Sequence, residues 1–321
     1  MLYSCIKFIG RIAIRIFCRK IVINQPELLK IKGPVLLAAN HPNSFIDSVI
    51  LDLLFEQPVW SLARGDIFKK PFIIRVLTAL KILPVYRTSE GVENLSENYK
   101  TFEACIDIFR NNGLITIFSE GKCINEWHLR PLKKGTARLA IKAWEENIPL
   151  QVIPVGINYS SFRRFGKNIF LNFGSPIIKE NINLTEADGM RHQSFYNQLQ
   201  KQLEQLVFEI PRLDKQKQKE VLEIKPSVTK QLFLSIPAAV GYLIHLPLYL
   251  PIKKITWEKT NHNDHYDSVL TGVLLFGYIL YLILTVSIVW LLTGLWWAIF
   301  LLLLLPFTAW AYTQLKPQLD K

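Results

Sequence analysis

The stretch LLAANHPNSFIDSVIL, residues 36–51, joins a buried strand to an apolar helix through a short polar break. The first apolar run stops at Asn40, and His41 opens the polar loop. The segment then becomes apolar again, apart from a single charge at Asp47. A strand that leads through a tight loop into a helix is the repeating unit of layered α/β domains. The stretch therefore predicts an α/β fold with polar side chains held at the end of a strand.

The same alternation extends on both sides of this stretch. From residue 33 to about 175, short apolar runs typical of strands alternate with segments of helical periodicity. Residues 186–223 are rich in Gln, Glu and Leu and are expected to form one long surface helix. We therefore predict a domain over 31–225 in which helices cover a layered sheet.

Charge and hydropathy divide the chain into a basic front and an apolar back. The protein has 321 residues, 50% of them hydrophobic, and a net charge of +12. No charged residue occurs over 268–315. Because about 20 apolar residues cross a bilayer as a helix, this run predicts a transmembrane hairpin. Its helices are expected over about 269–290 and 295–314, with the break at Thr293 and Gly294.

Two further segments are predicted to lie at the membrane surface. Residues 1–30 are expected to contain an amphipathic interfacial helix, because cations recur at every fourth position among Ile and Phe. These cations are Lys7, Arg11, Arg15 and Arg19. A core helix with one solvated face would give a similar pattern. Residues 226–267 are apolar but interrupted by proline, which favours an interfacial or partly inserted segment.

The basic residues near the apolar segments indicate an orientation. Both ends of the predicted hairpin lie on one side of the membrane, and Lys253, Lys254 and Lys316 favour the cytoplasmic side. We therefore predict an integral membrane protein whose α/β domain is on the cytoplasmic face. The cysteines are far apart and lack C-x-x-C spacing, which favours reduced thiols over disulfides or zinc.

His41 and Asp47 can act together only if His41 precedes the helix. In a continuous helix, residues six positions apart point about 240° away from each other. Pro42 suits a helix entry, and Asn43 or Ser44 can cap it, so that Asp47 falls in the first turn. The competing interpretation is structural, because Ser44 and Asp47 also have the spacing of an ordinary capping box.

Other polar residues follow predicted strands further along the chain. Arg87 ends the segment 65–87, and Glu120 and Gly121 come directly after the strand expected over 114–118. Ligand sites in layered α/β domains gather at strand ends. These residues are therefore candidates for one shared site with His41.

Together, the blocks resemble the glycerolipid acyltransferase superfamily, which includes glycerol-3-phosphate and 1-acylglycerol-3-phosphate acyltransferases. The family pattern is N-H-x4-D, a block ending in Arg, F-P-E-G and a V-P-V block, and it is similar to about residues 35–175 here. Five residues separate His41 from Asp47, where most members have four. A subset similar to glycerol-3-phosphate/dihydroxyacetone-phosphate acyltransferases has five, with the same H-x-N-x-F-x-D layout. Ser119 replaces the proline of F-P-E-G, which is expected to leave the loop before Glu120 less rigid.

This resemblance implies a membrane-bound O-acyltransferase of phospholipid biosynthesis. The donor would be acyl-CoA or acyl-carrier protein, and the acceptor glycerol-3-phosphate, dihydroxyacetone phosphate or 1-acylglycerol-3-phosphate. His41 would be the general base and Asp47 would orient it. Backbone N–H groups at the start of the 44–55 helix or near Gly121 would stabilise the oxyanion. The residues expected to contact substrates are Asn43, Ser44, Arg87 for a phosphate, Glu120 for hydroxyls, Gly121 and Lys122.

Several alternatives remain open at this point. A lysophospholipid-remodelling acyltransferase and a non-catalytic membrane lipid-binding scaffold would share the fold. The basic charge favours membrane lipids over nucleic acid, because the regularly spaced cations are interleaved with Ile and Phe. No cofactor, metal or acyl-enzyme is expected, and Ser44 lacks the G-x-S-x-G elbow of a nucleophile. The motif HNDHYD, residues 262–267, is expected to form a polar turn at the membrane interface.

Overall fold

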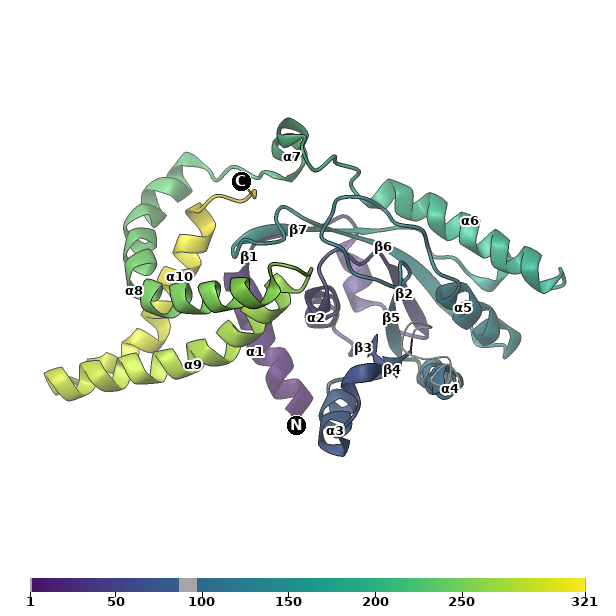
Figure 1. Cartoon of the computed structure of the whole chain (residues 1–321), viewed down its shortest axis with the longest axis horizontal. Coiled ribbons are helices and arrows are strands. Elements are labelled where there is room, and N and C mark those ends of the chain that lie inside the picture. Colours follow the sequence, from purple (N-terminus) through teal and green to yellow (C-terminus); the bar gives the residue numbers. More distant parts are fainter. Residues whose placement is uncertain (1, 87–96, 321) are drawn as a thin grey trace.

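The computed structural model describes residues 2–86 and 97–320 (Figure 1). The described part contains a seven-stranded sheet in the order β1-β7-β6-β2-β5-β3-β4. Neighbouring strands are parallel except for β6 and β7, which are antiparallel. The predicted α/β fold is confirmed. The strands are β1 (Cys18–Ile23), β2 (Val35–Ala39), β3 (Val59–Arg64), β4 (Ile82–Val85), β5 (Leu114–Phe118), β6 (Gln151–Tyr159) and β7 (Lys167–Phe173).

Helices cover both faces of this sheet. One core lies beneath α1 (Leu2–Phe17) and α2 (Phe45–Leu54). The other lies beneath α4 (Glu97–Arg110), α5 (Gly135–Glu145) and α6 (Asp188–Leu206). The remaining α-helices are α3 (Pro71–Ala79), α7 (Lys215–Leu222), α8 (Val228–Thr260), α9 (Tyr266–Thr293) and α10 (Leu301–Leu315).

Strand β2 is central and buried over its whole length. Alternate side chains of a strand point to opposite faces, so Val35 and Leu37 enter the core beneath α2 while Leu36 and Ala38 enter the core beneath α5. Because both faces hold the strand, the loop that follows Ala39 starts from a rigid point at the middle of the sheet.

The predicted helical segment over 1–30 is wrong beyond Phe17. Residues Cys18–Ile23 form β1, which pairs in parallel with β7 at the edge of the sheet. The run Ile21-Val22-Ile23 consists of β-branched residues, which favour a strand. The sheet domain therefore begins before residue 31.

Helix α1 does not present its cations as one exposed arc. Lys7 is buried and pairs with Asp52 at 3.3 Å. Arg11 donates to the carbonyl oxygens of Leu53 (2.8 Å) and Phe55 (3.0 Å) at the end of α2. Cations are favourable at a helix carboxyl terminus, so these contacts fix α1 to α2. The exposed face of α1 is instead partly apolar and includes Phe8, Ile9 and Ile12.

The prediction of one long helix over 186–223 is also wrong. Helix α6 ends at Leu206 and α7 begins only at Lys215. Pro211 cannot donate a backbone hydrogen bond within a helix, and Ile210 forms an isolated β-bridge with Trp127. The segment between the two helices crosses the surface as a loop.

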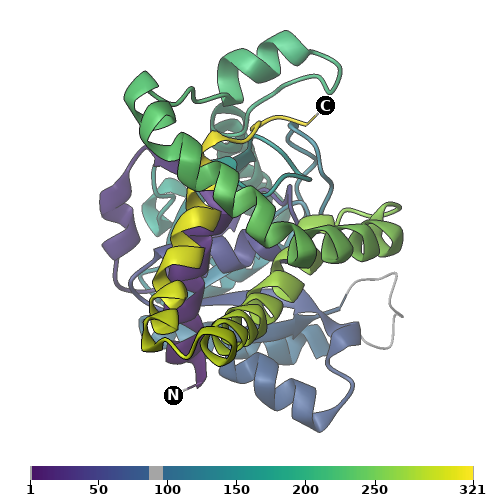
Figure 2. The same ribbon diagram turned by 90° about the vertical axis from the view of Figure 1, so that its left-hand side faces the viewer.

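The apolar back forms helices on one side of the molecule, and Figure 2 shows α8, α9 and α10 in front of the sheet domain. Gly294 ends α9 with a φ of 67°, so the break predicted at Thr293 and Gly294 is confirmed. A short 3₁₀ segment, Trp296–Phe300, then leads into α10.

Within the described residues, three helical stretches are long and apolar enough to cross a membrane. One of them is α8, so most of the predicted interfacial segment 226–267 is a single helix of 33 residues. Figure 1 shows α8 bending along its length, and it contains Pro237, Pro247 and Pro251, which kink helices. Gly241 lies against the backbone of Thr308 in α10, where a Cβ would come within 2.2 Å of the carbonyl oxygen. Helix α8 therefore packs closely against α10.

Candidate active site

The polar loop after β2 is tied to the neighbouring strand by Asn40. Its side chain donates to the carbonyl oxygen of Ile157 (3.0 Å) and accepts from the N–H of the same residue (2.7 Å). Both bonds go to the backbone of β6, and Asn40 is buried. The position from which His41 projects is therefore fixed by the sheet.

His41 and Asp47 lie together as the sequence predicts. The Nδ1 atom of His41 is 2.8 Å from Oδ2 of Asp47. His41 sits in the loop before α2, and the fully buried Asp47 belongs to the first turn of that helix. Ser44, between them, has a φ of 56°, an uncommon value for a residue with a side chain. This turn brings the imidazole back over the carboxylate.

The competing capping box is not formed. Ser44 makes no side-chain hydrogen bond to the start of α2. Oδ2 of Asp47 accepts from the N–H of Asn43 (2.8 Å), and Oδ1 accepts from the hydroxyl of Tyr159 (2.6 Å). Burial raises the pKa of Tyr159 well above its usual range, so its hydroxyl stays protonated and can donate. Asp47 therefore holds the loop and the imidazole in one arrangement.

The two nitrogens of the His41 imidazole differ in their hydrogen bonding. An ionised carboxylate can only accept, so Nδ1 carries the proton and Nε2 presents its lone pair. Among the described residues, nothing hydrogen bonds to Nε2, and the side chain is 15% exposed. The ring stacks on Phe118 at the end of β5, with centroids 4.0 Å apart and planes within 9°. This arrangement is that of an oriented general base.

Glu120 supports the same loop from β5. Its Oε2 accepts from the backbone N–H of His41 (2.8 Å), and its Oε1 accepts from that of Arg130 (2.9 Å). The side chain is buried, and burial raises its pKa while these two backbone bonds oppose that shift. The structure thus shows two backbone partners of Glu120, and its expected contact with substrate hydroxyls stays a prediction.

The loop around Glu120 is well anchored despite the missing proline. The N–H of Ser119 donates to Ala39 (2.8 Å), a bond that proline cannot make, and its hydroxyl meets that of Thr136 (3.0 Å). Gly121 has a φ of 68°, which suits glycine, and its N–H donates to the carbonyl of Phe118. Lys122 is exposed beside this turn.

The turn between α8 and α9 packs onto the His41 loop, which the sequence does not predict. Nδ1 of His265 lies 2.6 Å from the hydroxyl of Ser44, and the hydroxyl of Ser268 accepts from the N–H of Ile46 (3.2 Å). The predicted polar turn at 262–267 is therefore present between α8 and α9, and it also lies against the loop that carries His41. Contacts across more than 200 residues of sequence leave no local signal.

A buried ion pair joins the start of α9 to the sheet. Lys167 of β7 pairs with Asp267 at the start of α9, and both side chains are fully buried. The same Oδ2 of Asp267 accepts from the amide of Asn43 (2.7 Å). Asn43, expected to contact substrate, is thus held between α2 and α9.

Some of the expected oxyanion donors are already bonded. The N–H of Ser44 donates to the sulfur of Cys123 (2.8 Å), that of Ile46 to Ser268, and that of Gly121 to Phe118. These three groups are therefore not free in this conformation. Arg87, the predicted phosphate ligand, lies outside the described residues.

Comparison with known proteins gives matches to acyltransferases. Residues 20–158 match the Acyltransferase family. The chain is 25% identical over 164 residues to glycerol-3-phosphate O-acyltransferase 2 of Saccharomyces cerevisiae, covering 48% of this chain and 22% of that relative. It is 27% identical over 177 residues to the 1-acyl-sn-glycerol-3-phosphate acyltransferase of Borreliella burgdorferi, covering 55% of this chain and 64% of that relative. The chain thus spans less than two-thirds of the length of these relatives.

One solved structure is also similar. The crystal structure of the 1-acyl-sn-glycerophosphate (LPA) acyltransferase PlsC from Thermotoga maritima superposes with a TM-score of 0.44 and 16% identity. The superposition covers 62% of this chain and 79% of that chain.

Proposed function

We propose, from the confirmed resemblance to the glycerolipid acyltransferase superfamily, that this protein is a membrane-bound O-acyltransferase of phospholipid biosynthesis. It would move a fatty acyl group from acyl-CoA or acyl-carrier protein to a glycerol phosphate acceptor. The observation that carries the proposal is the imidazole of His41, fixed through Nδ1 by the buried Asp47 and open at Nε2.

The geometry suits a direct transfer without an acyl-enzyme. Nε2 of His41 accepts the proton of the acceptor hydroxyl while the hydroxyl oxygen attacks the thioester carbonyl. Asp47 stabilises the resulting imidazolium, and Tyr159 and the Asn43 N–H keep the carboxylate in place. The tetrahedral intermediate then collapses: the C–S bond breaks, the thiolate takes the proton from His41, and the new ester C–O bond remains.

The apolar helices support attachment to a membrane. Most large side chains of α9 are exposed and apolar, and water would not accommodate such a surface on a monomer. We place the sheet domain on the cytoplasmic side, because Lys253 and Lys254 lie in the last turns of α8, just before α9, and Lys316 follows the end of α10. The exposed apolar residues of α1 would lie in the same interface.

The identity of the acyl acceptor can be tested directly by an activity assay. The five-residue spacing from His41 to Asp47 favours glycerol-3-phosphate or dihydroxyacetone phosphate. With acyl-CoA as donor, we expect kcat/KM for one of these two to exceed that for lysophosphatidylcholine at least ~10-fold. The measurement is thiol release with glycerol-3-phosphate, dihydroxyacetone phosphate, lysophosphatidate and lysophosphatidylcholine.

The same panel separates the alternatives. A preference for lysophosphatidylcholine would identify a remodelling enzyme. An absence of thioester consumption with every acceptor, and with both CoA and acyl-carrier protein donors, would leave a lipid-binding scaffold.

Replacing Glu120 by glutamine is expected to lower kcat about 10-fold and the free energy of unfolding by ~1–3 kcal/mol. The glutamine amide can accept from only one of the two backbone N–H groups and turns an NH₂ donor toward the other. Activity and thermal midpoint are measured together, with Glu204→Gln on the exposed face of α6 as the control. If the Glu120→Gln variant matched the parent in both, Glu120 would not position the loop.

A further inference from the structure

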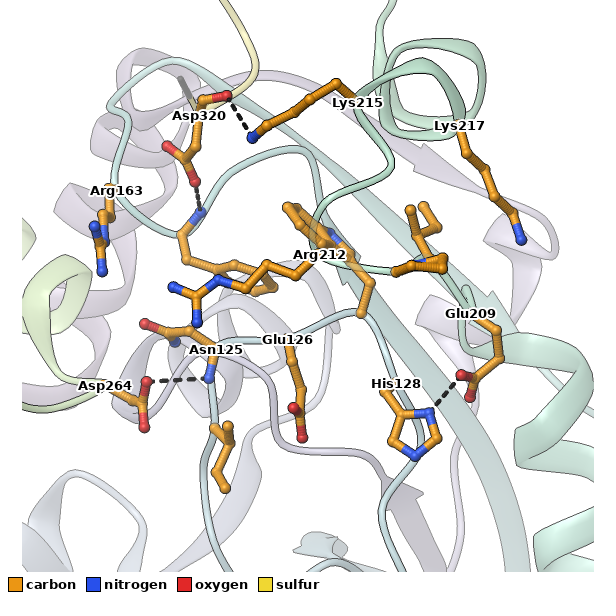
Figure 3. A pocket seen from close by; sticks show the side chains of 15 residues that line it. Asn125, Glu126, His128, Arg163, Glu209, Arg212, Lys215, Lys217, Asp264 and Asp320 are labelled. Carbon is orange, nitrogen blue, oxygen red and sulfur yellow. Dashed lines mark hydrogen bonds and ion pairs between the residues drawn. The ribbon is translucent and has the colours of Figure 1, made fainter.

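A pocket of about 530 Å³ adjoins the loop that carries His41 (Figure 3). Asn125 lines this pocket, and its side chain donates to the carbonyl oxygen of Pro42 (2.8 Å). Asp264, from the turn between α8 and α9, accepts from the Asn125 N–H (3.2 Å). The far wall is formed by the loop between α6 and α7 and the first turns of α7. Asn125 therefore lines the pocket and also contacts the backbone of Pro42, the residue next to His41.

The acidic side chains around this pocket are engaged by partners. Glu209 accepts from the N–H of Leu129 (2.8 Å) and pairs with Nδ1 of His128 at 2.5 Å. Asp320 accepts from the hydroxyl of Ser161 (2.6 Å) and from the N–H of Phe162 (3.1 Å). These bonds hold the carboxylates in place, and the fourth carboxylate of the lining, Glu126, pairs with Arg130 at 3.0 Å.

The arginines are arranged differently. Arg163 and Arg212 direct their guanidinium groups toward the side of the pocket that Asn125 and Asp264 line (Figure 3). Neither pairs with a carboxylate of the described residues, and the guanidinium of Arg163 lies over the ring of Trp257, with Cζ 4.9 Å from the ring centroid. Both side chains are exposed, so each guanidinium is accessible to a solute that enters the pocket. Their planar donor sets match a phosphate group.

We propose that Arg163 and Arg212 bind a phosphate group of a substrate in this pocket. The inference rests on the proposed function, which supplies two phosphate-bearing substrates. A volume of about 530 Å³ is larger than a lone phosphate needs and typical of sites for small organic ligands. The pocket therefore favours the nucleotide phosphates of coenzyme A over the phosphate of a glycerol phosphate acceptor. Lys215 and Lys217 at the rim add positive charge.

The test is a binding measurement on the full chain in detergent. Isothermal titration with coenzyme A, and separately with glycerol 3-phosphate, is made on the parent, Arg163→Gln, Arg212→Gln and the double variant. Lys219→Gln, an exposed cation of α7 that does not line the pocket, is the control. We expect the Kd for coenzyme A to rise at least ~10-fold in the double variant and to stay unchanged in the control.

The outcomes separate the source of the phosphate. A rise confined to glycerol 3-phosphate supports the site and assigns it to the acceptor. Changes below twofold for both probes, or no binding of either probe to the parent, overturn the proposal.

Transferase activity of the parent and of the double variant is measured beside the titrations. Arginine-dependent binding in a parent chain that shows no transferase activity would support the phosphate site and contradict the proposed reaction. Full transferase activity of the parent together with arginine-independent binding would contradict the phosphate site alone.

Discussion

We expect the replacement of His41 by alanine to lower acyl transfer at least ~1,000-fold, while the fold and the proposed membrane attachment are kept. Removing the imidazole deletes the proposed general base, and general base catalysis supplies about 10²–10⁴ in rate. The substitution is expected to be structurally mild, because the ring is partly exposed and Asp47 retains Tyr159 and the Asn43 N–H as donors. Thiol release from acyl-CoA in the presence of glycerol-3-phosphate measures the loss.

The matched control is His192→Ala. His192 lies on α6, away from the His41 loop, and its ring is 3.8 Å from the exposed Asp188. This variant should keep the parent rate. Activity of the His41→Ala variant within tenfold of the parent would exclude His41 as the base, provided that both variants show the same thermal midpoint.

The second large effect concerns stability. Replacing Asp267 by alanine leaves Lys167 buried without its carboxylate and removes the acceptor for the Asn43 amide. Breaking a buried pair on one side costs about 3–5 kcal/mol, because an uncompensated charge remains in the interior. The control is Glu103→Ala, which breaks the exposed pair with Lys142 and should cost at most ~1 kcal/mol. Thermal midpoints in detergent compare the two.

The double variant Lys167→Met/Asp267→Leu provides the decisive comparison. Apolar replacement of both partners removes the buried charge altogether and should recover most of the loss. The ion pair would not stabilise the contact between β7 and α9 in the way described if Asp267→Ala were as stable as the parent. The same conclusion would follow if the double variant were no more stable than Asp267→Ala.

The Asp267→Ala variant should also depend on pH. In the parent chain burial lowers the pKa of Lys167 to about 7 from its usual 10.5, and removing Asp267 takes away a carboxylate that favours the charged lysine. Between these values the unfolded chain binds the proton that the folded chain releases, so stability rises as pH increases. The thermal midpoint of Asp267→Ala is therefore expected to increase from pH 7 to pH 10. A midpoint that falls over this range would contradict the assignment.

The local sequence pattern was sufficient to predict the central strand of the sheet and the contact between His41 and Asp47. The run before Asn40 is apolar on both faces and followed by a polar loop, so a central strand with His41 at its end follows from the sequence. The His41–Asp47 contact could be inferred because six residues set the geometry. The break at Gly294 was predictable for the same reason, since it depends on adjacent residues.

Features that depend on distant partners were not predictable. The strand Cys18–Ile23 is stabilised by pairing with β7, about 150 residues later, so its cations and apolar residues also fitted a longer helix. Tyr159 and Phe118 carry no polar pattern that marks them as neighbours of His41. The loop between α6 and α7 was hidden in a Gln- and Glu-rich tract, although Pro211 was a signal that could have divided it.

The buried contact between Asn43 and Asp267 has a consequence for the order of synthesis. These partners are 224 residues apart, and Lys167, which shares the same carboxylate, is made 100 residues before Asp267. A growing chain that has completed every strand of the sheet therefore still holds an unpaired lysine and an unpaired amide beside His41. The contacts of the His41 loop are therefore complete only after the ribosome has synthesised the beginning of α9.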